Sequence, residues 1–233
     1  MRSLFHFVAY HATRLAAQCL FACVTRVHVV GWANTQNTGA FILAANHISH
    51  FDPPIIATLV RRKVDWMAMA ELFPHPVLGH VLRAIECFPA DRNRADRATI
   101  RSALDRLKRE RIVGMFPEGG IRDGLQSVLQ GAPLRPGVST LAHMAKVPIL
   151  PCVILGSDRL YSKGHWLPFR RTPIWVGFGE PIPHSSDMEK SSARARTEQA
   201  LAAAFQKLYA EMREKFSLQA DDLPRSPQER MSQ

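Results

Sequence analysis

Short apolar runs alternate along this chain with segments of helical periodicity, and this alternation constrains the fold more than any other feature of the sequence. Residues 40–45 (AFILAA) form a continuous apolar run, which is typical of a strand buried on both faces of a parallel sheet. Residues 96–109 instead place Ile100, Leu104 and Leu107 at helical spacing, with arginines on the opposite face. Strands that alternate with helices predict an α/β fold with a mostly parallel central sheet flanked by helices on both faces.

The same pattern gives the expected elements in chain order. Strands are expected at residues 27–30, 40–45, 66–70, 85–89, 112–116, 147–155 and 174–178. Helices are expected at residues 53–60, 76–84, 96–109 and 138–145, with a last helix that begins near Asp187. The prolines of the 147–155 segment indicate a strand at the edge of the sheet or the end of a strand, because proline cannot donate to the ladder.

The length of 233 residues fits one α/β domain with short additions at its ends. We expect the domain at residues 25–217 and a polar flexible tail at residues 218–233. Residues 1–24 are apolar, but their longest uninterrupted run, from Leu15 to Val24, is too short to span a bilayer, which takes about 20 apolar residues. We expect an amphipathic helix at a membrane interface there, and the alternatives are a helix packed on the domain core and a signal peptide.

The net charge of +10 and the isoelectric point near 10.0 favour an anionic partner, which could be a phosphate-bearing ligand, a nucleic acid or an anionic membrane. The basic stretch at residues 92–111 contains no aromatic residue for base stacking, so we expect a solvated helix face there and no nucleic acid as a partner. Residues 159–171 mix aromatic and basic side chains, which is typical of a loop at a membrane interface.

The densest group of chemically active side chains comes directly after the first buried run. Residues 46–52 (NHISHFD) hold two histidines, a carboxylate, a serine and an amide, at a place where open α/β sheets bind ligands. A histidine that contacts a carboxylate is a good general base, so His47 is the candidate base and Asp52 its partner. On a regular helix these two side chains would point about 140° apart. Their contact therefore requires the chain to turn between them.

Other interpretations of this segment remain open. His47, His50 and Asp52 could be three metal ligands of a hydrolase, although the fuller ligand set of a two-metal enzyme is missing. Ser49 does not lie in the G-x-S-x-G elbow of a hydrolase nucleophile. The polar side chains could also cap the following helix. The four cysteines complete no zinc site, because neither a C-x-x-C pair nor a suitable histidine spacing occurs.

A second candidate segment ends the strand expected at residues 112–116. Residues 114–120 (GMFPEGG) bring a proline, a carboxylate and two glycines to the strand end. Glu118 is expected to face the same crevice as His47. Gly119 and Gly120 allow the backbone to approach a ligand closely or to present amide groups to it.

Together the two segments resemble the glycerolipid acyltransferase family, whose best-known members are 1-acylglycerol-3-phosphate acyltransferases. The H-x-x-x-x-D pattern of His47 and Asp52 is followed by F-P-E-G at residues 116–119. Between them, residues 85–92 (IECFPADR) are similar to the second motif of the family, which ends in a phosphate-binding arginine. That arginine is Arg92 in this chain.

A fourth motif of the family, a proline-centred strand, is similar to residues 147–151 (VPILP), so the resemblance covers about residues 27–183. It implies an O-acyltransferase of phospholipid biosynthesis, which moves a fatty acyl group from acyl-CoA or acyl carrier protein to a lysophospholipid. The expected acceptor is 1-acylglycerol-3-phosphate, and another lyso-lipid is the alternative. The residues expected to bind substrate are Arg92, Glu118, Gly119, Gly120 and Arg122.

The resemblance implies neither a metal nor another cofactor. It implies an enzyme on the cytoplasmic face of a membrane, bound as a peripheral or monotopic protein. One departure concerns the third motif, because Gly120 and Ile121 stand where the family usually has threonine and arginine. The next basic positions are Arg122 and Arg135, and this change leaves the acceptor headgroup open.

Overall fold

The computed structural model describes residues 2–90, 97–167, 171–184, 190–219 and 222–231, with the backbone alone for residues 2–7 and 190–192. Its centre is a seven-stranded sheet with the strand order β1-β7-β6-β2-β5-β3-β4. The strands are β1 (Thr25–Val30), β2 (Phe41–Ala45), β3 (Val64–Met69), β4 (Phe88–Ala90), β5 (Ile112–Met115), β6 (Ile149–Leu155) and β7 (Thr172–Phe178).

Neighbouring strands run parallel throughout this sheet, with one exception. β6 and β7 pair antiparallel, and β1 pairs parallel with β7, so β1 and β7 run against the other strands. The prediction of an α/β fold with a mostly parallel central sheet is confirmed.

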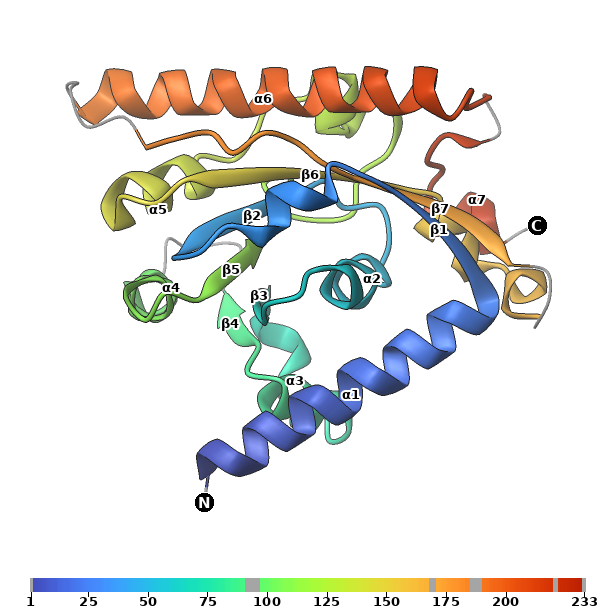
Figure 1. The fold of residues 1–233 in the computed structure, drawn as a ribbon, viewed down its shortest axis with the longest axis horizontal. Helices are drawn as coiled ribbons and strands as arrows, with labels where there is room; N and C mark the ends of the chain where they lie inside the picture. The colour runs from blue at the N-terminus through green and yellow to red at the C-terminus, as the bar shows by residue number, and fades with distance from the viewer. Residues whose placement is uncertain (1, 91–96, 168–170, 185–189, 220–221, 232–233) are drawn as a thin grey trace.

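Helices cover both faces of the sheet (Figure 1). They are α1 (Arg2–Val24), α2 (Asp52–Leu59), α3 (Leu78–Ala84), α4 (Arg97–Lys108), α5 (Gly137–Ala145), α6 (Lys190–Lys215) and α7 (Pro227–Met231). Apolar side chains of α4, α5 and α6 share one core with one face of the sheet, and those of α1 and α2 share a second core with the other face. The helix start expected near Asp187 lies outside the described residues.

The short 3-10 helices lie mostly in the connections. They are η1 (Trp32–Gln36), η2 (Ala70–Leu72), η3 (Gly124–Gln126), η4 (Val128–Gln130), η5 (Ser157–Tyr161) and η6 (Lys163–Trp166). Of these, η5 follows β6 directly and becomes important at the functional site.

β2 explains the continuous apolar run, because both of its faces are covered. Ile42 and Ala44 belong to the core under α4, α5 and α6, whereas Leu43 and its alternate neighbours belong to the core under α1 and α2. β2 also lies between the parallel strands β5 and β6. The segments that follow β2, β5 and β6 therefore meet at one edge of the sheet, where ligands of such folds bind.

The prediction of an edge strand at residues 147–155 is wrong, because β6 is paired on both sides. Pro148 precedes the strand, as expected for a strand end, but Pro151 lies inside it. β7 pairs with β6 only from Cys152 onward, and the Pro151 carbonyl accepts a hydrogen bond from the Gly179 N–H at 2.9 Å, beyond the end of β7. The missing N–H of Pro151 therefore falls where the ladder is already interrupted.

Residues 218–219 and 222–231 differ from the flexible tail expected at residues 218–233, of which residues 220–221 and 232–233 lie outside the described residues. Leu218 is buried in the core beside α6. In α7, Arg230 is also buried, and its Nε lies 2.7 Å from Oδ2 of the buried Asp158. The polar composition of this segment predicted a flexible tail. A polar segment can nevertheless be ordered, because here the buried carboxylate of Asp158 binds the charge of Arg230.

α1 packs against the domain with one side and exposes apolar side chains on another. Phe21 and Val24 belong to the core under α2, and Nη1 of Arg14 donates to the carbonyl of Arg61 at 2.8 Å. Leu15 and Leu20 remain exposed. Within the described part of the chain, no helix combines the length and the apolar character needed to cross a bilayer.

Candidate active site

The corner between β2 and α2 brings His47 and Asp52 together. β2 ends at Ala45 and α2 begins at Asp52, so the chain turns between them as the hypothesis requires. Nδ1 of His47 lies 2.8 Å from Oδ2 of Asp52. The contact uses Nδ1, which leaves Nε2 as the ring nitrogen that can meet a substrate.

Asp52 is fully buried, and every donor that surrounds it is formally neutral or a histidine. Oδ2 also accepts hydrogen bonds from the N–H groups of Ile48 and Ser49, both at 2.8 Å. Oδ1 accepts from the hydroxyl of Ser157 at 2.5 Å. These bonds replace the water that the carboxylate loses on burial, and they fix its orientation toward His47.

Stacked aromatic rings pack against the imidazole of His47. The Phe116 ring stacks on His47 with centroids 3.9 Å apart and an interplanar angle of 17°. Trp66 also stacks on Phe116, with ring centroids 5.0 Å apart. The His47 side chain is 15% exposed, so one edge of the ring still reaches the surface. The sequence analysis singled out Phe116 only as part of the F-P-E-G motif. It did not predict that the Phe116 ring stacks on His47.

Glu118 lies beside His47, as expected, but its carboxylate binds protein groups. Oε2 accepts from the His47 N–H at 2.6 Å, and Oε1 accepts from the Ser127 hydroxyl and the Val128 N–H at 2.8 and 2.9 Å. Burial raises the pKa of Glu118, and these hydrogen bonds oppose the rise. The structure therefore differs from the expected substrate contact, because the buried carboxylate supports the backbone of His47.

The two glycines of the third motif behave differently. Gly119 has a φ of 70°, which favours glycine, and a Cβ there would lie 2.3 Å from Nε of Arg135, so a larger residue would be strained and would displace that side chain. The N–H of Gly119 donates to the carbonyl of Phe116 at 3.0 Å. Of the two amides considered for ligand binding, that of Gly119 is thus already used within the turn, and Gly120 is the better candidate.

Two arginines are tied to the same strand ends through their backbones. The N–H of Arg122 donates to the carbonyl of His47 at 2.8 Å, and the N–H of Arg135 donates to the carbonyl of Pro117 at 2.9 Å. Arg122 is half-buried and Arg135 is exposed. Arg92, the arginine of the second motif, lies outside the described residues.

The metal site considered from the sequence does not form among the described residues. Nδ1 of His50 lies 2.5 Å from the hydroxyl of Tyr161, so His50 turns to a different partner from that of His47. Burial and the neighbouring His47 lower the pKa of His50, while Asp52 raises it. His47, His50 and Asp52 therefore do not converge on one point.

The aromatic and basic residues at 159–171 also differ from the membrane loop expected there. Arg159 is buried and binds Asp222 at 2.7 Å, and Tyr161 contacts His50. Trp166 packs against the Phe51 ring at 5.3 Å. The described part of this segment thus packs on the domain, while residues 168–170 lie outside the description.

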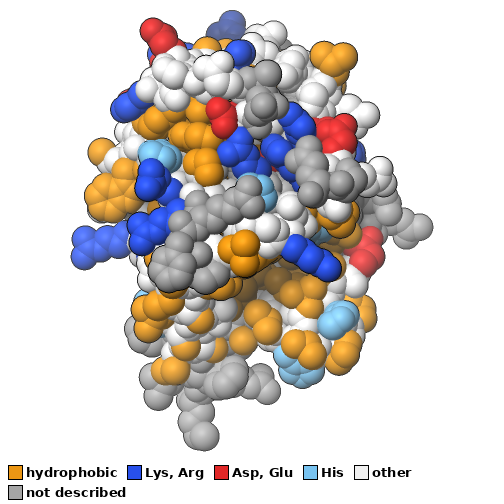
Figure 2. Space-filling view, turned by 90° about the vertical axis from the view of Figure 1, so that its right-hand side faces the viewer, with side chains coloured by type: hydrophobic (Ala, Val, Ile, Leu, Met, Phe, Trp, Pro, Cys, Tyr) orange, Lys and Arg blue, Asp and Glu red, His pale blue; other side chains and the backbone are white. Residues whose placement is uncertain are grey.

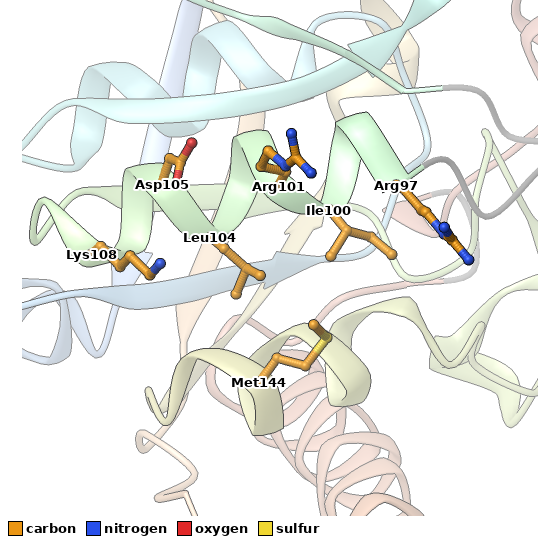
Figure 3. A pocket seen from close by; sticks show the side chains of 7 residues that line it. All are labelled: Arg97, Ile100, Arg101, Leu104, Asp105, Lys108 and Met144. Carbon is orange, nitrogen blue, oxygen red and sulfur yellow. The ribbon is translucent and has the colours of Figure 1, made fainter.

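A surface pocket of about 400 Å³ lies between α4 and α5, away from this site (Figure 3). Ile100, Leu104 and Met144 form its apolar floor, and Arg97, Arg101 and Lys108 stand around it. Neither His47 nor Asp52 lines it. The reactive groups are instead at the ends of β2, β5 and β6.

Comparison with known proteins agrees with this geometry. A family model described as Acyltransferase matches residues 26–155, more than half of the chain. The 1-acyl-sn-glycerol-3-phosphate acyltransferase of Bacillus subtilis (strain 168) is 28% identical over 171 residues, which cover 73% of this chain and 80% of that protein. The protein of the same name from Saccharomyces cerevisiae (strain ATCC 204508 / S288c) is 29% identical over 159 residues, 67% of this chain and 51% of that protein.

A solved structure supports the same relationship across most of the chain. The crystal structure of the 1-acyl-sn-glycerophosphate (LPA) acyltransferase PlsC from Thermotoga maritima aligns with a TM-score of 0.65 and 25% identity. The alignment covers 90% of this chain and 81% of that one. The family match, the relatives and the fold lead to one conclusion: the chain belongs to the Acyltransferase family and is an O-acyltransferase.

Proposed function

We propose that this acyltransferase moves a fatty acyl group from a thioester to the free hydroxyl of 1-acylglycerol-3-phosphate, as a step of phospholipid biosynthesis. The observation that carries the proposal is the 2.8 Å contact between His47 and a fully buried Asp52 at the C-terminal edge of the sheet. The names of the relatives supply the expected acceptor, since they are called 1-acyl-sn-glycerol-3-phosphate acyltransferases.

In this mechanism His47 is the general base. Nε2 takes the proton of the acceptor hydroxyl while Asp52 holds Nδ1–H and stabilises the imidazolium that forms. The acceptor oxygen attacks the thioester carbonyl, the carbon–sulfur bond breaks, and the proton passes from His47 to the departing thiolate. An acyl ester and a free thiol result, without a metal, another cofactor or a covalent enzyme intermediate.

The glycine turn and the arginines serve the two substrates. We assign the stabilisation of the oxyanion of the tetrahedral intermediate to the N–H of Gly120. The guanidinium groups of Arg92, Arg122 and Arg135 bind the acceptor phosphate through charge-assisted hydrogen bonds. The donor is acyl-CoA or acyl carrier protein.

The acceptor is tested by incubating the purified protein with acyl-CoA or acyl carrier protein and a panel of lyso-lipids, and then identifying the products by mass spectrometry. We expect diacylglycerol phosphate from 1-acylglycerol-3-phosphate and much less product from acceptors with other headgroups. Faster transfer to a different lyso-lipid would correct the acceptor but keep the chemistry. No product with any acceptor and either donor would contradict the proposed function.

The phosphate contacts are tested by comparing arginines at the site with one on the surface. Arg92→Ala and Arg122→Ala should raise the acceptor KM more than the thioester KM, because each removes a phosphate contact. Arg101 is the control, since it lies exposed on α4 beside the separate pocket. An equal change in all three variants would show that only general positive charge matters.

We also propose that α1 and α3 dock the enzyme on the cytoplasmic face of an anionic membrane, where the lipid acceptor resides and a cytosolic thioester is available. α1 exposes Leu15 and Leu20, and α3 exposes Leu78 and Val81. Figure 2 shows hydrophobic side chains over the lower part of one face, at the height of α1 and α3 in Figure 1, below a region rich in Lys and Arg. Insertion of these apolar side chains into the bilayer and attraction of the net charge of +10 to the anionic lipids then both favour membrane binding.

Sedimentation with anionic liposomes tests the docking surface. Wild type should bind less in high salt but remain partly bound, because salt screens charge and leaves apolar burial intact. The double variant Leu15→Ser, Leu20→Ser should dissociate in high salt. The control Leu125→Ser changes a leucine that is 86% exposed in η3 and should behave like wild type. Equal retention of both variants at high salt would rule out docking through α1.

A further inference from the structure

The 3-10 helix η5 (Ser157–Tyr161) contacts the catalytic corner at both of its ends. The Ser157 hydroxyl donates to Oδ1 of Asp52 at 2.5 Å, and the Tyr161 hydroxyl lies 2.5 Å from Nδ1 of His50. The His50 N–H also donates to the Tyr161 oxygen at 3.0 Å. One short element therefore holds two residues of the segment between β2 and α2.

The middle of η5 faces the other way and binds the C-terminal segment, residues 222–231. Oδ2 of Asp158 lies 2.7 Å from Nε of Arg230 and accepts from the Arg225 N–H at 3.0 Å. Nη2 of Arg159 donates to Oδ1 of Asp222 at 2.7 Å. Asp158, Arg159 and Arg230 are all buried, so solvent screens these contacts little.

The contact of Ser157 has a particular consequence for Asp52. Oδ2 of Asp52 contacts three donors, namely His47 and two backbone N–H groups, whereas Oδ1 accepts from the Ser157 hydroxyl. A partial rotation of the carboxylate about its Cβ–Cγ bond would move Oδ2 away from His47 and break their contact. A donor on Oδ1 prevents this rotation in a site that water does not reach, because Asp52 and Ser157 are both fully buried.

We propose that Ser157 is a positioning residue for Asp52, and that residues 222–231 hold Ser157 in place through Asp158 and Arg159. This inference rests on the proposed general-base role of His47. The carboxylate stays aligned with the imidazole because η5 is fastened on both sides, to the catalytic corner and to the C-terminal segment. The C-terminal segment thereby acts on catalysis without touching the substrate.

The first experiment compares Ser157→Ala with Ser139→Ala. Ser139 is a matched control, since its buried hydroxyl also contacts a carboxylate, Oε1 of Glu198 at 2.5 Å, but on α5 and away from the site. We expect Ser157→Ala to lower kcat by about 10- to 100-fold, as loss of a supporting partner behind an active-site group does. KM should stay near wild type, and the thermal unfolding temperature should fall no more than in Ser139→Ala. An unchanged kcat, or equal losses in the two variants, would overturn the proposal.

A spectroscopic measurement separates this proposal from the proposed function. The Hδ1 proton of His47 in its hydrogen bond to Asp52 can be followed by NMR and assigned by its absence in His47→Gln. Ser157→Ala should shift or broaden this signal, and Ser139→Ala should leave it unchanged. If wild type transfers no acyl group, the function is wrong, but this signal still decides the positioning role. An unchanged signal in Ser157→Ala rejects that role even in an active enzyme.

The role of the C-terminal segment is tested by a double-mutant cycle between Ser157→Ala and Arg230→Gln. Because Arg230 acts through η5, Arg230→Gln should lower kcat in the wild-type background and add little in the Ser157→Ala background. Gln228→Ala is the control on α7, since Gln228 is exposed. Full additivity of the two losses would show that the segment does not act through Ser157.

If Ser157→Ala fails to fold, Tyr161→Phe takes its place. An unchanged kcat in Tyr161→Phe would overturn the proposal that η5 holds the catalytic corner in position.

Discussion

Among the fully buried aspartates of the described residues, Asp52 and Asp65 lie at opposite edges of the same sheet, and their surroundings differ. Asp52 lies at the C-terminal edge and accepts hydrogen bonds from backbone N–H groups, the Ser157 hydroxyl and His47. Asp65, at the start of β3, is instead surrounded by cations. Arg111 contacts both of its oxygens at 2.6 Å, and Arg106 and Lys63 approach to 3.6 and 3.9 Å.

The difference teaches what makes a buried carboxylate available for catalysis. Neutral donors stabilise the negative charge of Asp52 without cancelling it, so in the proposed mechanism this charge remains to stabilise the imidazolium of His47. At Asp65 the cations already neutralise the carboxylate. Burial raises the pKa of Asp65, and Arg111, Lys63 and Arg106 oppose this rise. We therefore assign Asp52 to the reaction and Asp65 to the stability of the fold.

The largest expected effect breaks the catalytic side of this comparison. His47→Ala and Asp52→Asn should each lower kcat by about 10²–10⁴-fold, because the first removes the general base and the second removes the charge that stabilises its protonated form. Circular dichroism should show the fold of the wild type in His47→Ala. Near wild-type turnover of His47→Ala on a competent acceptor would show that another group removes the proton.

Asp65→Asn should give the opposite result. The substitution leaves Arg111, Arg106 and Lys63 without their shared buried partner, which should cost about 1–3 kcal/mol of unfolding free energy in urea denaturation. Turnover below the unfolding temperature should stay near that of wild type, because Asp65 is at the edge of the sheet away from His47. A loss of kcat as large as that of Asp52→Asn would remove the distinction between the two aspartates.

Glu118 sharpens the comparison, since it is a buried carboxylate with neutral donors but no imidazole. In Glu118→Gln the side-chain amide cannot accept at both ends, so one of the N–H groups of His47 and Val128 loses its acceptor. We expect a loss of about 1–3 kcal/mol in unfolding free energy and a lower kcat with KM unchanged, because His47 loses its backbone support. The control is Glu211→Gln, an exposed residue paired with Lys207 on α6, which should change stability by less than about 0.5 kcal/mol.

The sequence predicted those features of the candidate active site that depend on residues close together in the chain. His47 and Asp52 lie in one short segment, and their spacing with the preceding apolar run was enough to infer a corner. The roles of Ser157 and Arg230 could not be predicted, because they depend on which strands lie side by side and on a contact 72 residues apart between Asp158 and Arg230. Glu118 was expected near His47, but a motif does not show which donors occupy its oxygens.

The smallest expected effect concerns acid stability at the cation-rich edge, where Glu86 joins Asp65. Burial alone would raise the pKa of Glu86, but hydrogen bonds and charge from Lys63 and Arg111 lower it to about 2, from an ordinary value of 4.5. A carboxylate with a lowered pKa stabilises the folded protein above its unfolded pKa, and this contribution is lost as the pH falls from about 4.5 toward 2.

Glu86→Gln should therefore flatten the acid side of the stability curve. The pKa difference sets an upper limit of about 3 kcal/mol, and we expect about 1 kcal/mol because the side chain is 30% exposed and solvent screens the pair. Urea denaturation between pH 5 and 2.5 measures it, with Glu211→Gln again as the control. The variant should be less stable than wild type at pH 5 and approach it at pH 2.5. A constant difference across this range would mean that Glu86 stabilises the edge by packing, and the cations there would then act through Asp65 alone.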